Sequence, residues 1–91
     1  MKAKAHLYIS GRVQGVYYRG FTLEVAESLG LKGWVRNLPD RRVEAVFEGD
    51  RDLIEKAILT CKQGPTASRV TDIDIEWEDR LEDFKEFDIR Y

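Results

Sequence analysis

Apolar and polar residues alternate along four stretches of the chain, and a period of two is typical of a half-buried β-strand. In the first stretch, Ala5, Leu7 and Ile9 share one face, while His6 and Ser10 lie on the other. The four stretches are residues 3–10, 43–49, 72–77 and 87–91. The pattern therefore predicts four strands, the last of which is short enough to form the edge of a sheet.

A fifth strand is predicted over residues 31–38, of sequence Leu-Lys-Gly-Trp-Val-Arg-Asn-Leu. Residues 39–42, of sequence Pro-Asp-Arg-Arg, follow it and have the composition of a tight turn. Strand 43–49 begins directly after this turn, so the two strands are expected to form an antiparallel hairpin.

Two other segments have the spacing of an amphipathic helix. The first opens at Gly20-Phe21 and is expected to stop at Gly30. The second runs from a cap at Asp50 to just before Gly64. The apolar stripes of the two helices are Phe21, Val25, Ala26 and Leu29, and Leu53, Ile54, Ala57, Ile58 and Cys61.

The elements follow one another as strand–helix–strand, turn, strand–helix–strand, with one more strand at the end. This order predicts an α+β, ferredoxin-like β-α-β-β-α-β sandwich. Its antiparallel sheet would carry both helices on one face and an additional C-terminal edge strand. A chain of 91 residues supports one core, so residues 1–91 are expected to form a single domain.

Composition narrows the class of protein. The formal net charge of −2 argues against a general nucleic-acid or membrane-surface binder. No leader pattern or apolar run of membrane-spanning length is present, so we expect a cytoplasmic protein. The lone Cys61 excludes an internal disulfide and is interpreted as a core residue. Asn37 is the only asparagine in a chain that is 35% charged, which resembles a heat-adapted composition.

The strongest chemical signal is the glycine-containing loop Gly11–Arg19 between the first strand and the first helix. Glycine lets a loop backbone approach a ligand closely. Backbone N–H groups, a helix N-terminus and a guanidinium would then lie close together. These three groups are the usual components of an anion-binding site. A plain strand-to-helix turn with a surface arginine is the alternative interpretation.

Arg19 and Asn37 are expected to share the rim of one pocket in this architecture. The planar guanidinium of Arg19 suits a phosphoryl group, and the amide of Asn37 can orient a water molecule. The sequence contains no Ser-His-Asp set and no cluster with the spacing of metal ligands. Phosphoryl transfer to water mainly requires positioning and charge stabilisation, and a carboxylate leaves without protonation. These residues thus favour hydrolysis of a carboxyl–phosphate anhydride.

Two motifs carry a resemblance to a known family. The segment Gly11–Arg19 resembles the acylphosphatase signature, and Gly33–Asn37 resembles the second signature of that family. The ending Phe87–Tyr91 is also similar. The resemblance implies hydrolysis of small acyl phosphates to carboxylate and inorganic phosphate, without a metal or other cofactor. It implies that Arg19 binds the phosphoryl group, Asn37 orients the attacking water, and the loop supplies backbone donors from Gln14, Gly15, Val16, Tyr17 and Tyr18.

Two positions depart from the family pattern. Tyr18 stands where many members have phenylalanine, and Arg41 stands where the turn often has glycine. The second departure leaves the shape of the turn beyond Asn37 open.

A non-catalytic module that binds phosphate, another anion or a partner is the alternative function, because this fold serves many purposes. An RNA-binding sheet is disfavoured, because strand 43–49 lacks the exposed aromatic residues and the basic glycine-aromatic motif that such sheets use. We expect a monomer whose partners are the acyl phosphate and its phosphate product, with no nucleic acid and no membrane.

Overall fold

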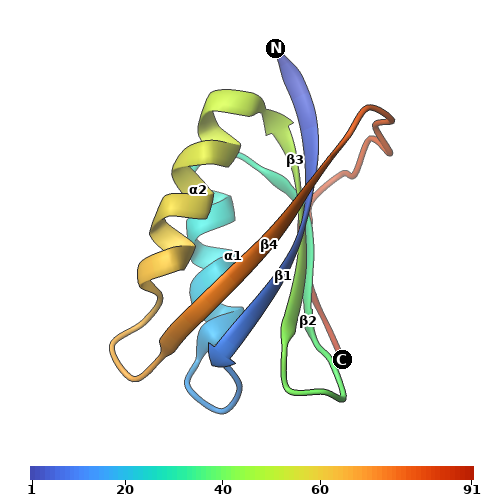
Figure 1. Cartoon of the computed structure of the whole chain (residues 1–91). Helices are drawn as coiled ribbons and strands as arrows, with labels where there is room; N and C mark the ends of the chain where they lie inside the picture. Colours follow the sequence, from blue (N-terminus) through green and yellow to red (C-terminus); the bar gives the residue numbers. More distant parts are fainter.

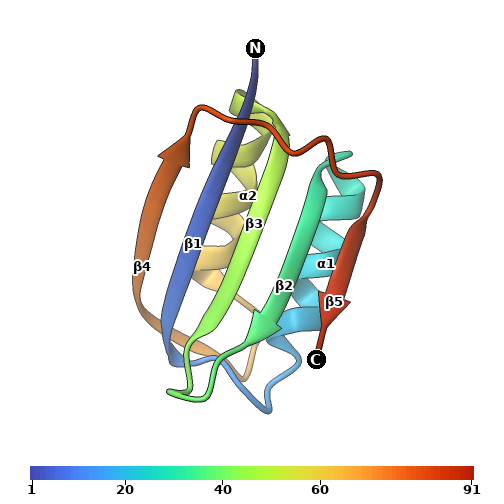
Figure 2. The same ribbon diagram turned by 90° about the vertical axis from the view of Figure 1, so that its right-hand side faces the viewer.

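The computed structural model describes residues 1–91 and contains two helices and one five-stranded sheet. The strands lie in the order β4-β1-β3-β2-β5, and both helices cover the same face of the sheet (Figures 1 and 2). This arrangement confirms the predicted ferredoxin-like sandwich. The elements are β1 (Lys2–Arg12), α1 (Tyr18–Ser28), β2 (Lys32–Asn37), β3 (Val43–Asp50), α2 (Arg51–Gln63), β4 (Arg69–Glu78) and β5 (Phe87–Arg90).

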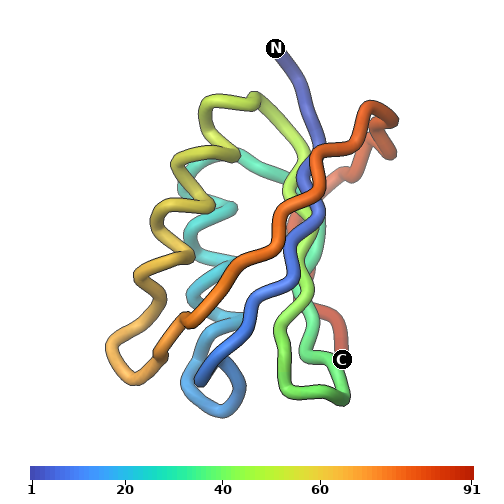
Figure 3. Tube along the Cα trace, in the orientation of Figure 1, coloured from blue at the N-terminus to red at the C-terminus, as the bar shows by residue number.

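The sheet is mixed, whereas the sequence pattern predicted an antiparallel one. β1 pairs antiparallel with β3 and β4, and β2 pairs antiparallel with β3, but β5 runs parallel to β2. The chain leaves β4 at one end of the sheet and crosses to the opposite edge before β5 begins (Figures 2 and 3). β4 ends at the end of the sheet where β2 begins, so a chain that crosses over at that end and turns back runs in the same direction as β2. Strand periodicity does not report this connection.

Alternation along the strands separates the core from the open face of the sheet. Ala5, Leu7 and Ile9 of β1 are fully buried beneath the helices, next to Ala45 and Phe47 of β3. The helices complete this core with residues that include Ile54, Ala57 and Cys61. No helix of the chain is long and apolar enough to cross a membrane.

Helix α1 begins at Tyr18, two residues before the predicted start. Its buried residues are Tyr18, Thr22, Val25 and Ala26, so the predicted stripe at Phe21 and Leu29 lies at the margin of the core. The Tyr18 hydroxyl donates to the Cys61 carbonyl at 2.7 Å, so this phenol can be buried without losing its hydrogen bond. The substitution of tyrosine for phenylalanine is therefore accommodated in the core.

Helix α2 starts as predicted from the cap at Asp50, whose carboxylate accepts from the Asp52 N–H at 3.0 Å. Cys61 lies on its buried side with no exposed surface, as predicted. Burial raises the pKa of the Cys61 thiol to about 11, which keeps it protonated at neutral pH. This cysteine is a core residue.

The turn between β2 and β3 forms without glycine. Arg41 adopts a left-handed backbone with a φ of 77°. The Arg41 N–H donates to the Leu38 carbonyl at 3.1 Å, and the Leu38 N–H donates to the Arg42 carbonyl at 2.8 Å. The side chain of Gln14 also donates to the Leu38 and Arg42 carbonyls, each at 2.9 Å. The turn is thus closed by its own backbone and tied to the glycine loop.

Glu48 fastens the crossover between β4 and β5 to the open face of the sheet. Its carboxylate is buried and accepts from the backbone N–H groups of Glu82, at 2.6 Å, and Phe84, at 2.9 Å. These two bonds fix the segment that leads into β5, the strand that pairs with β2.

We expect Glu48→Gln to lower the free energy of unfolding by about 2 kcal/mol, because an amide nitrogen would face one of two backbone donors and leave it unsatisfied. Urea unfolding followed by circular dichroism measures this loss. Glu86→Gln, an exposed residue of the same segment, is the matched control and should unfold like the wild type. Equal midpoints for both variants would contradict the anchoring role of Glu48.

Candidate active site

Arg19 and Asn37 line the same pocket, which has a volume of about 250 Å³. The pocket lies where the loop after β1, the N-terminus of α1, the end of β2 and the end of the chain meet. Gly15, Tyr17 and Tyr18 also line it. β3 separates β1 from β2, but the loop after β1 and the end of β2 still lie at the same end of the sheet (Figure 2).

The loop between β1 and α1 presents free backbone donors. Gly15 and Tyr17 have left-handed backbones, with φ of 76° and 68°. None of the backbone hydrogen bonds made by turns and loops is donated by residues 14–17. Successive N–H groups left free in this way form a concave site for an anion.

Helix α1 adds its N-terminus to this site. No side chain caps the helix, and its first turn contains no acidic residue. The first N–H groups of a helix have no partner within it, and they carry the positive end of its dipole. An anion at this position would supply the missing acceptor.

Tyr17 precedes the first residue of α1 and has a left-handed backbone conformation. Its ring lies against Gly20, where an added Cβ would clash with a ring carbon. Its hydroxyl donates to the Glu24 carboxylate, seven residues further along the chain, and this hydrogen bond raises the pKa of the Tyr17 phenol. The Tyr17 ring thus packs on α1 at Gly20, where a larger residue would displace it.

Arg19 projects from the first turn of α1. It forms no ion pair with a carboxylate, whereas Arg36, Arg42 and Arg51 each form one. Its guanidinium carbon lies 4.9 Å from the centre of the Tyr91 ring. The contact orients the guanidinium by a cation–π interaction and leaves its N–H donors available for a ligand.

Asn37 is the last residue of β2 and pairs with Val43, whose side chain is in the core beneath the helices. Strand alternation therefore turns Asn37 toward α1 and its neighbour Arg36 toward the open face. Asn37 Oδ1 is buried and has no hydrogen-bond partner. A buried acceptor without a partner costs free energy, so this atom is a functional candidate.

The structure does not bring every predicted residue to the pocket. The side chain of Gln14 bonds the β2–β3 turn, and Val16 packs against the core. At these two positions only the backbone is available to a ligand.

Sequence reasoning missed four pocket residues: Val13 and Gly20, which flank the predicted site residues of the loop, and Ile89 and Tyr91 in the tail. The alternation of the tail was visible, but it did not reveal that β5 lies beside β2. Ile89 pairs with Val35, which places this face of β5 on the same side of the sheet as Asn37. The end of the chain thus forms one wall of the pocket.

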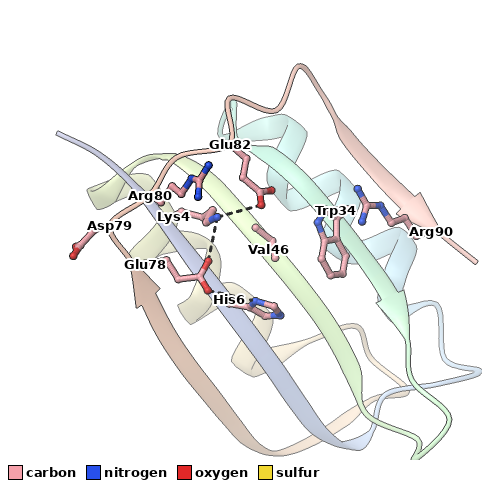
Figure 4. Close-up of a pocket in the computed structure, with 9 residues that line it drawn as sticks. All are labelled: Lys4, His6, Trp34, Val46, Glu78, Asp79, Arg80, Glu82 and Arg90. Carbon is pink, nitrogen blue, oxygen red and sulfur yellow. Dashed lines mark ion pairs between the residues drawn. The ribbon is translucent and has the colours of Figure 1, made fainter.

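A larger hollow, of about 680 Å³, lies on the open face of the sheet (Figure 4). Its lysine, Lys4, is already paired with Glu78 at 3.2 Å and with Glu82 at 3.5 Å. Trp34 forms part of its floor and packs against the guanidinium of Arg90 at 4.5 Å. The lysine and the two carboxylates of this hollow thus pair with one another, whereas Arg19 of the smaller pocket has no ion pair.

His6 lies on this open face and donates to Glu44 at 2.6 Å. Arg36 also donates to Glu44, at 2.6 Å. Although burial acts to raise it, the pKa of Glu44 lies below its ordinary value because these two donors stabilise the carboxylate. His6 thus hydrogen-bonds within a polar network on the open face and does not line the pocket of Arg19 and Asn37.

Fold and pocket together define a small α+β protein with a cradle for an anion beside an unpartnered amide. No group of three or more His, Cys, Asp and Glu side chains is arranged to hold a metal ion. The Acylphosphatase family model matches residues 5–89.

Relatives cover nearly the whole chain. It is 47% identical over 90 residues to an acylphosphatase of Pelotomaculum thermopropionicum, an alignment that covers 99% of this chain and 98% of the relative. It is 50% identical to an acylphosphatase of Syntrophobacter fumaroxidans, covering 99% and 93%. The crystal structure of acylphosphatase from Bacillus subtilis superposes with a TM-score of 0.96 at 36% identity and full coverage of both chains. The chain belongs to the acylphosphatase family, a family of hydrolases that act on acid anhydrides.

Proposed function

We propose that the protein hydrolyses small acyl phosphates by attack of water on phosphorus, with Arg19 and Asn37 as the catalytic residues. Arg19 and the backbone N–H groups of residues 14–18 hold the phosphoryl group, and Asn37 orients the water. The observation that carries this proposal is the unpartnered Asn37 Oδ1 in the pocket that Arg19 also lines. An acceptor in this position suits a water O–H group.

In the proposed step a new P–O bond forms to the water oxygen, and the P–O bond to the acyl group breaks. The electron pair of the broken bond leaves with the carboxylate, and both protons of the water remain on the phosphate product as H₂PO₄⁻. The carboxylate is a good leaving group, so no general acid is required. Arg19 and the loop N–H groups offset the charge on the phosphoryl oxygens throughout the reaction.

The test is the hydrolysis of benzoyl phosphate by the purified protein in the presence of EDTA, with free phosphate measured as product. We expect turnover that EDTA does not reduce and that inorganic phosphate inhibits competitively. Phosphate binding to a folded protein without any turnover would instead support the non-catalytic anion-binding module. Turnover that EDTA abolishes would contradict a mechanism carried by these residues alone.

The setting of the enzyme is also part of the proposal. We propose a monomer that acts on free substrate in the cytoplasm of a heat-adapted organism. The low amide content and dense charge of the sequence support heat adaptation. Light scattering across a dilution series tests the monomer, and a thermal melt tests heat adaptation.

A further inference from the structure

A second pocket, of about 450 Å³, adjoins the candidate active site at the same end of the sheet and is distinct from the hollow on the open face. Arg12 and Arg41 line it, and Val13 lines both this pocket and the first one. The Gln14 hydrogen bonds to the β2–β3 turn hold the two walls of the second pocket together. Loop and turn lie at the same end of the sheet in both views of the fold (Figures 1 and 2).

The charge around this second pocket is positive and uncompensated. Neither Arg12 nor Arg41 forms an ion pair, whereas Arg42 of the same turn is paired with Asp40 at 2.8 Å. Arg69 of β4, also without an ion pair, is the direct partner of Arg12 in the β1–β4 ladder. Like charges directly opposite each other in a sheet are destabilising. The pairing of Arg12 with Arg69 therefore places two like charges together with no ion pair to offset them.

Arg41 is also conformationally unfavourable at its position in the turn. Its φ of 77° lies in the left-handed region, which glycine adopts without a steric cost and arginine does not. The turn uses only the backbone of Arg41, through its N–H bond to Leu38. The strained position thus holds a charged side chain beside the phosphate loop without serving the turn.

We propose that Arg12 and Arg41, supported by the charge of Arg69, form a subsite for a second anionic group on the acyl part of the substrate. The preferred substrates are then acyl phosphates that carry a carboxylate or phosphate at the end remote from the reacting phosphoryl group. This inference rests on the proposed function. The remote group takes no part in the chemistry, and its contacts strengthen binding in the ground state and the transition state alike.

Benzoyl phosphate and 4-carboxybenzoyl phosphate test the subsite, because they differ only in a remote carboxylate on a rigid ring. We expect the wild type to show a kcat/KM about tenfold higher for the carboxylated substrate, mainly through a lower KM. The double variant Arg12→Gln, Arg41→Gln should bring this ratio close to one. The matched control is Arg80→Gln, Lys85→Gln, which removes two exposed charges from the β4–β5 segment at the other end of the sheet and should keep the wild-type ratio.

The control variant separates the subsite from general attraction of anions. It removes the same number of charges from the protein as the arginine variant, so loss of general attraction would lower the ratio of kcat/KM values in both variants. Arg41→Gly is a further variant that removes one charge and also relieves the left-handed backbone. It should melt no lower than the wild type and still lose part of the ratio. A wild-type ratio of one, or an unchanged ratio in the arginine variants, would overturn the subsite. If benzoyl phosphate itself is not hydrolysed, the proposed function fails instead.

Discussion

Replacing Arg19 with alanine is expected to lower kcat/KM for benzoyl phosphate by about 10²–10³-fold, corresponding to roughly 3–4 kcal/mol of lost transition-state stabilisation. Arg19 is the charged side chain of the pocket, and it forms no ion pair that would occupy its donors. The remaining N–H groups of the loop would still offer hydrogen bonds, but no full positive charge. Steady-state kinetics with free phosphate as readout measures the loss.

The controls for this variant separate chemistry from folding. Arg80→Ala removes an exposed arginine from the other end of the sheet and should keep wild-type kinetics. Arg19→Lys should recover only part of the activity, because an ammonium keeps the charge but not the planar pair of donors. Normal kinetics from a folded Arg19→Ala protein would remove this residue from the mechanism.

Replacing Asn37 with alanine is expected to lower kcat by about 10²-fold, since the water would lose the group that orients it. Competitive inhibition by inorganic phosphate should change little, because the phosphoryl cradle stays intact. The stability of the fold should not fall either. Asn37 Oδ1 has no hydrogen-bond partner in the protein, so its removal breaks no bond and ends the burial of an unsatisfied acceptor.

This combination of results distinguishes a functional amide from a structural one. A structural asparagine replaced by alanine would reduce stability and activity together. Gln63→Ala, which removes an exposed amide at the end of α2, is the control and should leave both quantities unchanged. An Asn37→Ala protein with full kcat, or one that loses phosphate inhibition in proportion to kcat, would contradict the role proposed for Asn37.

The short strand β5 connects the fold to the site. It pairs with β2 alone, yet it carries Ile89 into the pocket wall and leads to Tyr91, whose ring faces Arg19. The Glu48 carboxylate holds the segment before it. Loosening that segment would therefore disturb the pocket from the opposite face of the sheet, in addition to its effect on stability.

Much of the fold could be predicted from local sequence, because strand and helix periods report which side of each element is buried. The alternation of Ala5, Leu7 and Ile9, the cap at Asp50 and the buried Cys61 all agree with the structure. The two residues expected to share a pocket, Arg19 and Asn37, do share one. Each of these two residues ends a short sequence motif, Gly11–Arg19 or Gly33–Asn37, and such a motif can be identified without knowing the fold.

Tertiary structure alone decided which groups are neighbours. Nothing local to residues 87–91 indicated that β5 runs parallel to β2, or that Tyr91 meets Arg19. The bonds from Gln14 to the β2–β3 turn join segments that are distant in the sequence. The apolar period of a strand or helix shows which of its sides is buried, but not which other elements cover that side. Strand order, polar partners and the unpartnered Asn37 Oδ1 depend on how all the elements pack together.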